Sequence, residues 1–292
     1  MKHEHGHEHG HGHGYEGSND YIASKPLMEI VNVAIILGKP LVIKGEPGTG
    51  KTLLAHSISR ALGKKLLIWN IKSTTKAKDG LYVYDTVQRL NDARFKDRDI
   101  SDIRQYIKQG KLGQSFTASE QVVLLIDEID KADIEFPNDL LNELDEMSFW
   151  INELDEEVKA THRPIVVITS NSEKELPDAF LRRCVFYYIE FPDEDMMERI
   201  VKVHYPDIED RLMRDAIKKF YWIRQVDGLR KKPSTSELLD WLKALAMGGL
   251  DLEKIANEVP YIGTLIKSEQ DTDRVARTAQ SHGGTGFGFR RR

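Results

Sequence analysis

The sequence predicts an α/β fold, a three-layer αβα sandwich with a parallel five-stranded sheet, followed by a small all-helical domain. Short, nearly continuous runs of Val, Ile and Leu alternate with helical segments as far as residue 192. Beyond that point the strand signals stop and amphipathic helical segments follow. The chain has 292 residues, 40% of them hydrophobic and 30% charged, so it can bury a sizeable core.

The elements are expected in a definite order. A helix over 23–38 leads into a strand at 41–43, and a second helix, 52–62, ends at Gly63. We therefore predict an α/β domain at 21–192 and a helical lid domain at 193–268. The remaining strands are predicted at 66–71, 122–126, 165–168 and 186–191, and the helical segments of the lid at 193–203, 212–226, 236–247 and 252–266.

Both ends of the chain are read as tails. Residues 1–20 alternate His with Glu and Gly and lack apolar periodicity, so we expect a disordered segment. Its imidazoles suit Ni, Zn or Cu, but we favour a purification tag or a natural tail without catalytic use. Residues 269–292, which end in Arg290, Arg291 and Arg292, are expected to form a flexible basic tail.

Composition narrows the class of protein. A single cysteine, Cys184, allows no intrachain disulfide, so a reducing cytoplasm is expected. The apolar stretch 31–37 is far shorter than the ~20 residues of a membrane helix, and no membrane partner is expected. The net charge of -5 argues against a surface devoted wholly to nucleic acid, although a local basic patch is compatible with it.

A phosphate-binding loop lies between the strand at 41–43 and the helix at 52–62. The residues GEPGTGKT satisfy the pattern G-x-x-x-x-G-K-[ST]. Its glycines let successive backbone N–H groups point at phosphates, and the following helix adds its positive N-terminal end. Lys51 is expected to reach the β- and γ-phosphates, and the Thr52 hydroxyl to ligate Mg²⁺. The predicted nucleotide-binding residues are Gly45, Glu46, Pro47, Gly48, Thr49, Gly50, Lys51, Thr52 and Leu53.

Two acids end the strand at 122–126, in a Walker B pattern. Adjacent residues of a strand face opposite ways, so Asp127 and Glu128 must divide the work. Asp127 is expected to hold Mg²⁺ through its water shell, and Glu128 to act as general base on the attacking water. An acidic strand end is more often merely solvated, but its place downstream of a phosphate loop favours catalysis.

Two further polar segments follow these acids. The residues 130–133, DKAD, resemble a guanine-reading motif, but they come directly after the metal acid. We read them as a helix cap region and expect ATP rather than GTP. Asn171 ends the next strand, where it would orient the attacking water or touch the γ-phosphate. The alternative is that Asn171 only caps the following loop, and we favour the role at the water or the γ-phosphate.

Taken in order, GEPGTGKT, LLIDEID, ITSN and AFLRRC resemble the AAA+ superfamily of P-loop NTPases, and within it the MoxR family of the dynein-related, helix-2-insert branch. Residues 69–95 look like the helix-2 insertion of that branch, and residues 140–164 look like its pre-sensor hairpin. The likeness covers about 21–268. It implies a magnesium-dependent ATP hydrolase that works as a hexameric, chaperone-like ring and matures a protein with a von Willebrand factor A domain.

The resemblance also implies roles for single residues. Asn171 becomes the first sensor, and Arg183 the arginine finger offered to the adjacent subunit, with Arg182 as the competing candidate. Without the resemblance, both arginines read as a solvated helix end. The place of a second-sensor arginine holds Ser236, and the candidates to replace it are Arg230, Lys231 and Lys232.

Two other functions compete with this reading. A nucleic-acid motor is the first, because several relatives with the same insertion act on DNA or RNA and the end of the chain is basic. A nucleotide switch that binds ATP and hardly hydrolyses it is the second, and the intact Glu128 disfavours it.

Overall fold

The computed structural model describes residues 14–95, 100–248 and 258–281. These fall into two compact units. The first, here the α/β unit, comprises Met1–Lys44 and Lys51–Tyr188, and the second, the helical unit, comprises Gly45–Gly50 and Ile189–Arg292. The boundary at 188/189 lies close to the expected one at 192/193. The short segment Gly45–Gly50 groups with the helical unit, although the chain carries it between two elements of the α/β unit.

The central sheet has the five predicted strands, in the order β2-β5-β8-β1-β9. β5 pairs in parallel with β2 and β8, and β8 pairs in parallel with β1. The non-sequential order requires crossovers, which the intervening helices supply. The predicted parallel α/β fold is therefore confirmed. The strands are β1 Leu41–Gly45, β2 Leu66–Asn70, β5 Val123–Asp127, β8 Ile165–Ser170 and β9 Val185–Ile189.

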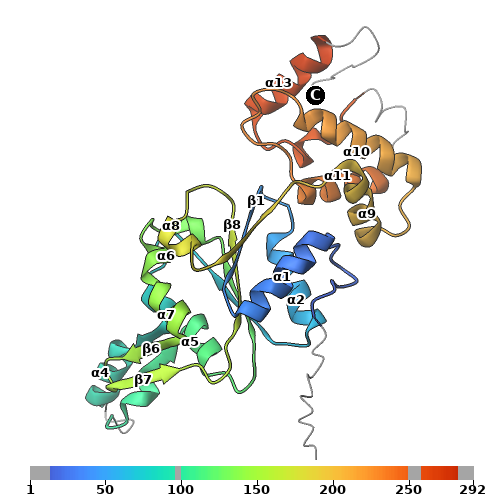
Figure 1. Ribbon diagram of the computed structural model, residues 1–292. Helices are drawn as coiled ribbons and strands as arrows, with labels where there is room; N and C mark the ends of the chain where they lie inside the picture. Colours follow the sequence, from blue (N-terminus) through green and yellow to red (C-terminus); the bar gives the residue numbers. More distant parts are fainter. Residues whose placement is uncertain (1–13, 96–99, 249–257, 282–292) are drawn as a thin grey trace, which may run out of the picture. The chain divides into compact units, whose positions relative to one another are not determined.

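The sheet is covered on both faces. Every residue of β8 is buried, and so are the first four residues of β5, which explains their continuous apolar sequences. Helices α1 (Lys25–Leu37) and α2 (Lys51–Ala61) lie on one side of the sheet, and α5 (Lys111–Phe116), α6 (Phe136–Asp139) and α7 (Leu141–Glu146) on the other (Figure 1). α1 begins at the cap Ser24, whose side chain accepts from the Leu27 N–H, and ends at Gly38 in the left-handed region.

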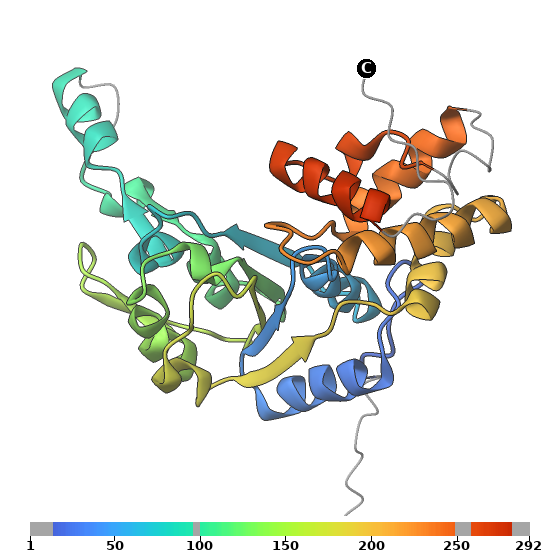
Figure 2. The same cartoon turned by 90° about the horizontal axis from the view of Figure 1, so that it is seen from above.

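Two insertions extend the α/β unit. Between β2 and β5 the chain forms α3 (Ala77–Leu81), β3 (Tyr82–Tyr84), α4 (Thr86–Phe95), η1 (Ile103–Tyr106) and β4 (Ile107–Gln109), with β3 and β4 antiparallel. This segment projects away from the sheet in Figure 2. Before β8, the antiparallel strands β6 (Ser148–Ile151) and β7 (Glu156–Lys159) form a hairpin. The hairpin lies within the predicted range 140–164. The inserted segment differs from the predicted 69–95, because residues 69 and 70 belong to β2 and the segment extends to the end of β4 at residue 109. The short elements η2 (Ile129–Lys131) and α8 (Asp178–Leu181) complete the unit.

The helical unit packs around its own core. Its elements are α9 (Glu194–His204), α10 (Asp210–Arg224), α11 (Thr235–Met247), η3 (Ile262–Thr264) and α13 (Glu269–Ser281). α11 begins at a capping box, in which Ser234 and Glu237 satisfy each other's backbone N–H groups. Buried Met197, Phe220, Trp241 and Val275 come from four different helices and share one apolar cluster.

Both predicted tails need correction where the structure describes them. Tyr15 is buried, its hydroxyl lies 2.7 Å from the Ser57 hydroxyl, and its backbone N–H donates to the Asn32 side chain at 2.7 Å. Packing against α1 and α2 therefore orders residues that a compositional reading assigns to a disordered segment. The helix α13 likewise replaces the first part of the expected flexible tail 269–292. Residues 1–13 and 282–292 lie outside the described part of the chain.

Burial of one face and hydrogen bonds of Asp271 explain why α13 forms. Val275 and Ala279 are buried four residues apart on one face. Asp271, also on this face, accepts from the backbone N–H groups of Arg230 and Lys231 at 3.0 and 3.3 Å. The segment expected to be helical at 252–266 differs too, since residues 258–266 contain only the short turn η3, and 252–257 lie outside the described residues.

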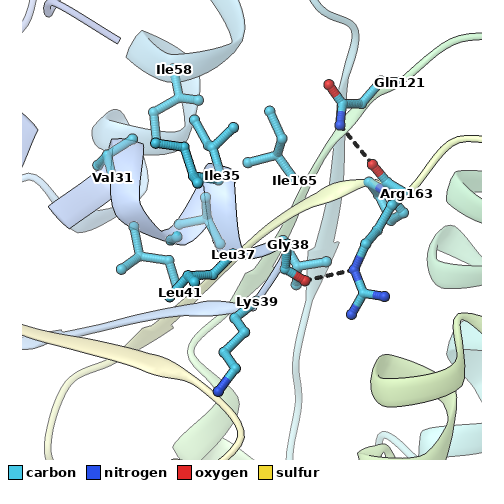
Figure 3. A pocket seen from close by; sticks show the side chains of 15 residues that line it. Val31, Ile35, Leu37, Gly38, Lys39, Leu41, Ile58, Gln121, Arg163 and Ile165 are labelled. Carbon is cyan, nitrogen blue, oxygen red and sulfur yellow. Dashed lines mark hydrogen bonds between the residues drawn. The ribbon is translucent and has the colours of Figure 1, made fainter. Parts of the chain in front are cut away.

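A cavity of about 370 Å³ opens beneath α1 at the amino ends of β1 and β8 (Figure 3). Its apolar wall includes Val31, Leu41 and Ile165. At its rim, the Arg163 guanidinium donates to the Gly38 carbonyl at 2.6 Å. Ligands of open α/β sheets bind at the carboxyl ends of strands, so this cavity is distinct from the candidate site described next. Among the described residues, no helix combines the length and the hydrophobicity needed to cross a membrane.

Candidate active site

The phosphate-loop motif joins β1 to α2. Gly48 and Gly50 have φ values of 80° and 83°, a region in which a side chain would be strained. The Glu46 carbonyl accepts from the Thr49 hydroxyl at 2.9 Å and from the Thr49 N–H at 3.4 Å, which closes a tight turn. Lys51 is buried and begins α2. The glycines thus stand where the predicted curled backbone requires them.

The two predicted metal ligands lie together in the α/β unit. The Thr52 hydroxyl donates to the two Asp127 carboxylate oxygens at 3.0 and 3.3 Å. Asp127 is the last residue of β5, while Thr52 is the second residue of α2. A hydroxyl oxygen and a carboxylate oxygen form the hard donor set that Mg²⁺ prefers, so these residues fit the predicted ion.

Thr169 connects the two Walker B acids and was missed in the sequence. It is fully buried in β8. Its hydroxyl donates to the Asp127 carboxylate at 2.7 Å and accepts from the Glu128 N–H at 2.8 Å. A threonine at the end of the apolar run 165–168, two residues before Asn171, was the available signal. Thr169 therefore fixes the orientation of the Asp127 carboxylate and the position of the Glu128 backbone.

Glu128 leaves the strand in an unusual backbone conformation. Its φ and ψ are 59° and 52°, in the left-handed region that non-glycine residues seldom adopt. The Asn171 amide donates to one oxygen of the Glu128 carboxylate at 2.9 Å, and the Lys131 ammonium pairs with the other. This bond to Glu128 raises the pKa of Lys131. The structure therefore brings the predicted base and the predicted first sensor into direct contact, with Lys131 as an unpredicted third member.

Asp130 anchors the loop that carries Asn171. Its carboxylate is buried and accepts from the backbone N–H groups of Asn171, at 3.1 Å, and Glu173, at 2.9 Å. In the same stretch, the Lys174 ammonium donates to the Ala132 carbonyl at 2.7 Å. The DKAD segment was expected to be a helix cap region. Its first acid instead caps the loop after β8, and only the short turn η2 forms there.

The two candidate finger arginines follow α8, and both are exposed. Arg183 pairs with the Asp145 carboxylate at 2.6 Å and donates to the Ala179 carbonyl at 3.1 Å. These contacts are not with Asp127 or Glu128. Among the described residues, Arg183 therefore lies outside the Asp127–Glu128 cluster of its own chain.

In the helical unit, Arg224 contacts the phosphate loop and was not predicted. It ends α10, and its guanidinium donates to the Glu46 carboxylate at 2.6 Å. Ser234 approaches the same loop, since a Cβ built on Gly48 would lie 2.5 Å from the Ser234 Cβ. Ser236, the residue at the expected second-sensor place, is exposed, as are the three candidate substitutes Arg230, Lys231 and Lys232.

Residues 40–184 match the AAA domain (dynein-related subfamily). A stretch of 66 residues is 46% identical to midasin of Giardia intestinalis and covers 22% of this chain and 1% of midasin. A solved structure of the RuvB Holliday junction branch migration motor of Thermotoga maritima aligns with a TM-score of 0.48 at 17% identity, over 79% of this chain and 65% of that one. This chain thus spans a small part of the first relative and about two thirds of the second.

Proposed function

Because residues 40–184 match a AAA domain, a domain whose family members are in general ATPases, we propose that this chain is a magnesium-dependent ATP hydrolase. The observation that carries the proposal is the contact of Asn171 with Glu128 beside the Thr52–Asp127 pair, at the carboxyl ends of β5 and β8. The phosphate loop runs from β1, which neighbours β8, into α2, which carries Thr52. The phosphate loop therefore leads along the chain directly into the helix that carries Thr52.

Each residue has a distinct task in this reaction. The loop N–H groups and Lys51 bind the phosphate oxygens, and Thr52 and Asp127 would hold Mg²⁺, which when bound neutralises phosphate charge. Glu128 takes a proton from a water molecule that Asn171 orients. The water oxygen forms a bond to the γ-phosphorus. The bond from that phosphorus to the bridging oxygen breaks, and ADP leaves with the electron pair.

ATP turnover of matched variants tests the hydrolase. Glu128→Gln keeps the shape of the side chain and removes the base, and we expect a fall in kcat of about 10² to 10⁴-fold with nucleotide binding retained. Lys51→Ala should abolish nucleotide binding itself. Glu120→Gln, an exposed change just before β5, is the control. Wild-type turnover in both site variants would refute the proposal.

We further infer a ring, hexameric as in the MoxR-type resemblance, in which Arg183 serves the site of the adjacent subunit. The exposure of Arg182 and Arg183, and the absence of any contact between Arg183 and Glu128 in the described chain, support this proposal. Mixing two inactive variants, Glu128→Gln and Arg183→Ala, tests it. Sites that combine an intact Glu128 with an intact Arg183 from the other variant should restore part of the turnover. A mixture as inactive as its components contradicts a finger in trans by Arg183, and Arg182→Ala is then mixed in the same way.

The client is proposed from the resemblance alone. We propose that this ring remodels a protein with a von Willebrand factor A domain in a reducing cytoplasm. The test adds purified von Willebrand factor A domain to the Glu128→Gln variant with ATP or ADP. Binding with ATP only supports this client. Salt-sensitive stimulation of wild-type turnover by DNA, without such binding, would favour a nucleic-acid motor instead.

A further inference from the structure

The phosphate loop contains a carboxylate of its own at Glu46, directly after Gly45. A nucleoside triphosphate brings several negative charges to this loop, and like charges at short range repel. Neutralisation of the Glu46 charge should therefore favour phosphate binding at this loop. Arg224 supplies that neutralisation in the structure, because its guanidinium lies 2.6 Å from the carboxylate.

Arg224 is held in place more firmly than a surface ion pair would be. Its side chain is only 9% exposed. One guanidinium nitrogen donates to the Pro233 carbonyl, and the guanidinium carbon lies 3.4 Å from the centroid of the Phe191 ring. A planar guanidinium with several donors can satisfy these partners together, whereas a flexible ammonium cannot.

The start of α11 also lies close to the loop. Ser234, the cap of α11, lies against Gly48, and the Pro233 carbonyl that Arg224 binds directly precedes this cap. One side chain therefore joins the end of α10, the start of α11 and the second residue of the phosphate loop. The pair spans 178 residues of sequence.

We propose that Arg224 is an electrostatic positioning residue of the nucleotide site, which cancels the Glu46 charge in the phosphate loop and so permits tight binding of the triphosphate. This inference rests on the proposed ATP site. It assigns to Arg224 a positive charge of the helical unit at the phosphate loop, a role for which the sequence offered Arg230, Lys231 and Lys232 as candidates. Its contribution is to nucleotide affinity rather than to the chemical step.

The sign of each substitution follows from the charges. Arg224→Gln removes the positive charge that faces the Glu46 carboxylate, and we expect the Kd for ADP and for a non-hydrolysable ATP analogue to rise about tenfold. Glu46→Gln leaves Arg224 unopposed, and the same Kd should fall about threefold. In the double variant both charges are gone, so its affinity should return to within about threefold of the wild type. A purely structural role of Arg224 predicts no such rescue.

The test measures Kd by fluorescence titration with labelled nucleotide, and folding by thermal melting, for all three variants. Arg211→Gln removes a positive charge from the same helix, where Arg211 faces Asp215 at 3.9 Å on the surface, and should leave Kd within about twofold of the wild type. Arg224→Lys keeps the positive charge but loses the planar guanidinium that joins Glu46, Pro233 and Phe191, so its Kd should lie between those of the wild type and Arg224→Gln. If Arg224→Gln does not fold, the tighter binding of Glu46→Gln decides the question.

The inference is overturned if the double variant binds as weakly as Arg224→Gln, if Glu46→Gln binds no more tightly than the wild type, or if Arg211→Gln has the same effect as Arg224→Gln. Failure of the wild-type chain to bind any nucleotide would instead refute the proposed function. The two failures are therefore distinguishable in one titration series.

Discussion

Substituting Asp130 by asparagine tests how the loop of Asn171 is held. The buried Asp130 carboxylate accepts from the backbone N–H groups of Asn171 and Glu173, at 3.1 and 2.9 Å. Oδ2 accepts both of these bonds, and Oδ1 accepts a longer third bond from the Asn171 N–H at 3.3 Å. An amide oxygen in the place of Oδ2 keeps two bonds without the negative charge, but the amide NH₂ in the place of Oδ1 would face the Asn171 N–H group. Hydrogen bonds to a charged group contribute about 1.5–3 kcal/mol each, so we expect Asp130→Asn to lower the free energy of unfolding of the α/β unit by about 2–4 kcal/mol.

The consequence for turnover is indirect. A displaced Asn171 no longer meets Glu128 at 2.9 Å, so kcat should fall about tenfold or more. The nucleotide Kd should change by less than about twofold, which is the scatter expected for an unrelated surface change. The side-chain hydrogen bonds of Thr52 and Asp127 in the described chain are with each other and with Thr169, and none of them involves Asp130.

Hydrogen exchange at single amides provides the direct measurement. The amides of Asn171 and Glu173 should exchange about tenfold to a hundredfold faster in Asp130→Asn, as expected when about 1.4–2.8 kcal/mol of protection is lost. Asp133→Asn, an exposed change in the same segment, is the control. Unchanged exchange at both amides together with unchanged kcat would show that Asp130 does not position the loop.

Three further changes have expected outcomes. Thr169→Val removes the hydroxyl that links the two acids, so kcat should fall about tenfold and stability by about 1–3 kcal/mol, while Thr169→Ser should restore both; a fully active valine variant would contradict this reading. Tyr15→Phe removes the hydroxyl contact with Ser57, and thermal melting should show a loss of about 1 kcal/mol, whereas an unchanged melting curve would mean that this contact adds nothing to stability. Burial raises the pKa of Cys184 from 9.0 to about 12, so at pH 8 the folded chain should react with iodoacetamide about a thousandfold more slowly than the unfolded chain, and equal rates would refute this assignment.

Local sequence by itself determined much of the site. The phosphate loop, the Walker B acids and Asn171 occupy strand ends, and the strands carry continuous apolar runs because both faces of the sheet are buried. Residues at the carboxyl ends of adjacent parallel strands must lie near one another. For that reason the contacts of Thr52 with Asp127 and of Asn171 with Glu128 could be anticipated from order along the chain.

Tertiary packing decided the rest. Thr169 and Asp130 act through backbone groups about 40 residues away in sequence, and their roles depend on which strands are neighbours. The pairing of Arg224 with Glu46 joins residues 178 positions apart, and no local pattern distinguishes this arginine from the others of the helical unit. A hydrogen bond between distant residues depends on how the intervening chain packs, and that is why it was visible only in the folded structure.

The two ends of the chain show the same division. The amino-terminal composition lacks any apolar period, yet one aromatic residue, Tyr15, finds a partner in Ser57 and is buried. At the other end Val275 and Ala279 provide only a narrow apolar stripe, and α13 forms because Asp271 caps two distant N–H groups while that stripe packs into the helical unit. Composition determined which segments could not form a core alone, and tertiary contacts determined which of them were nevertheless ordered.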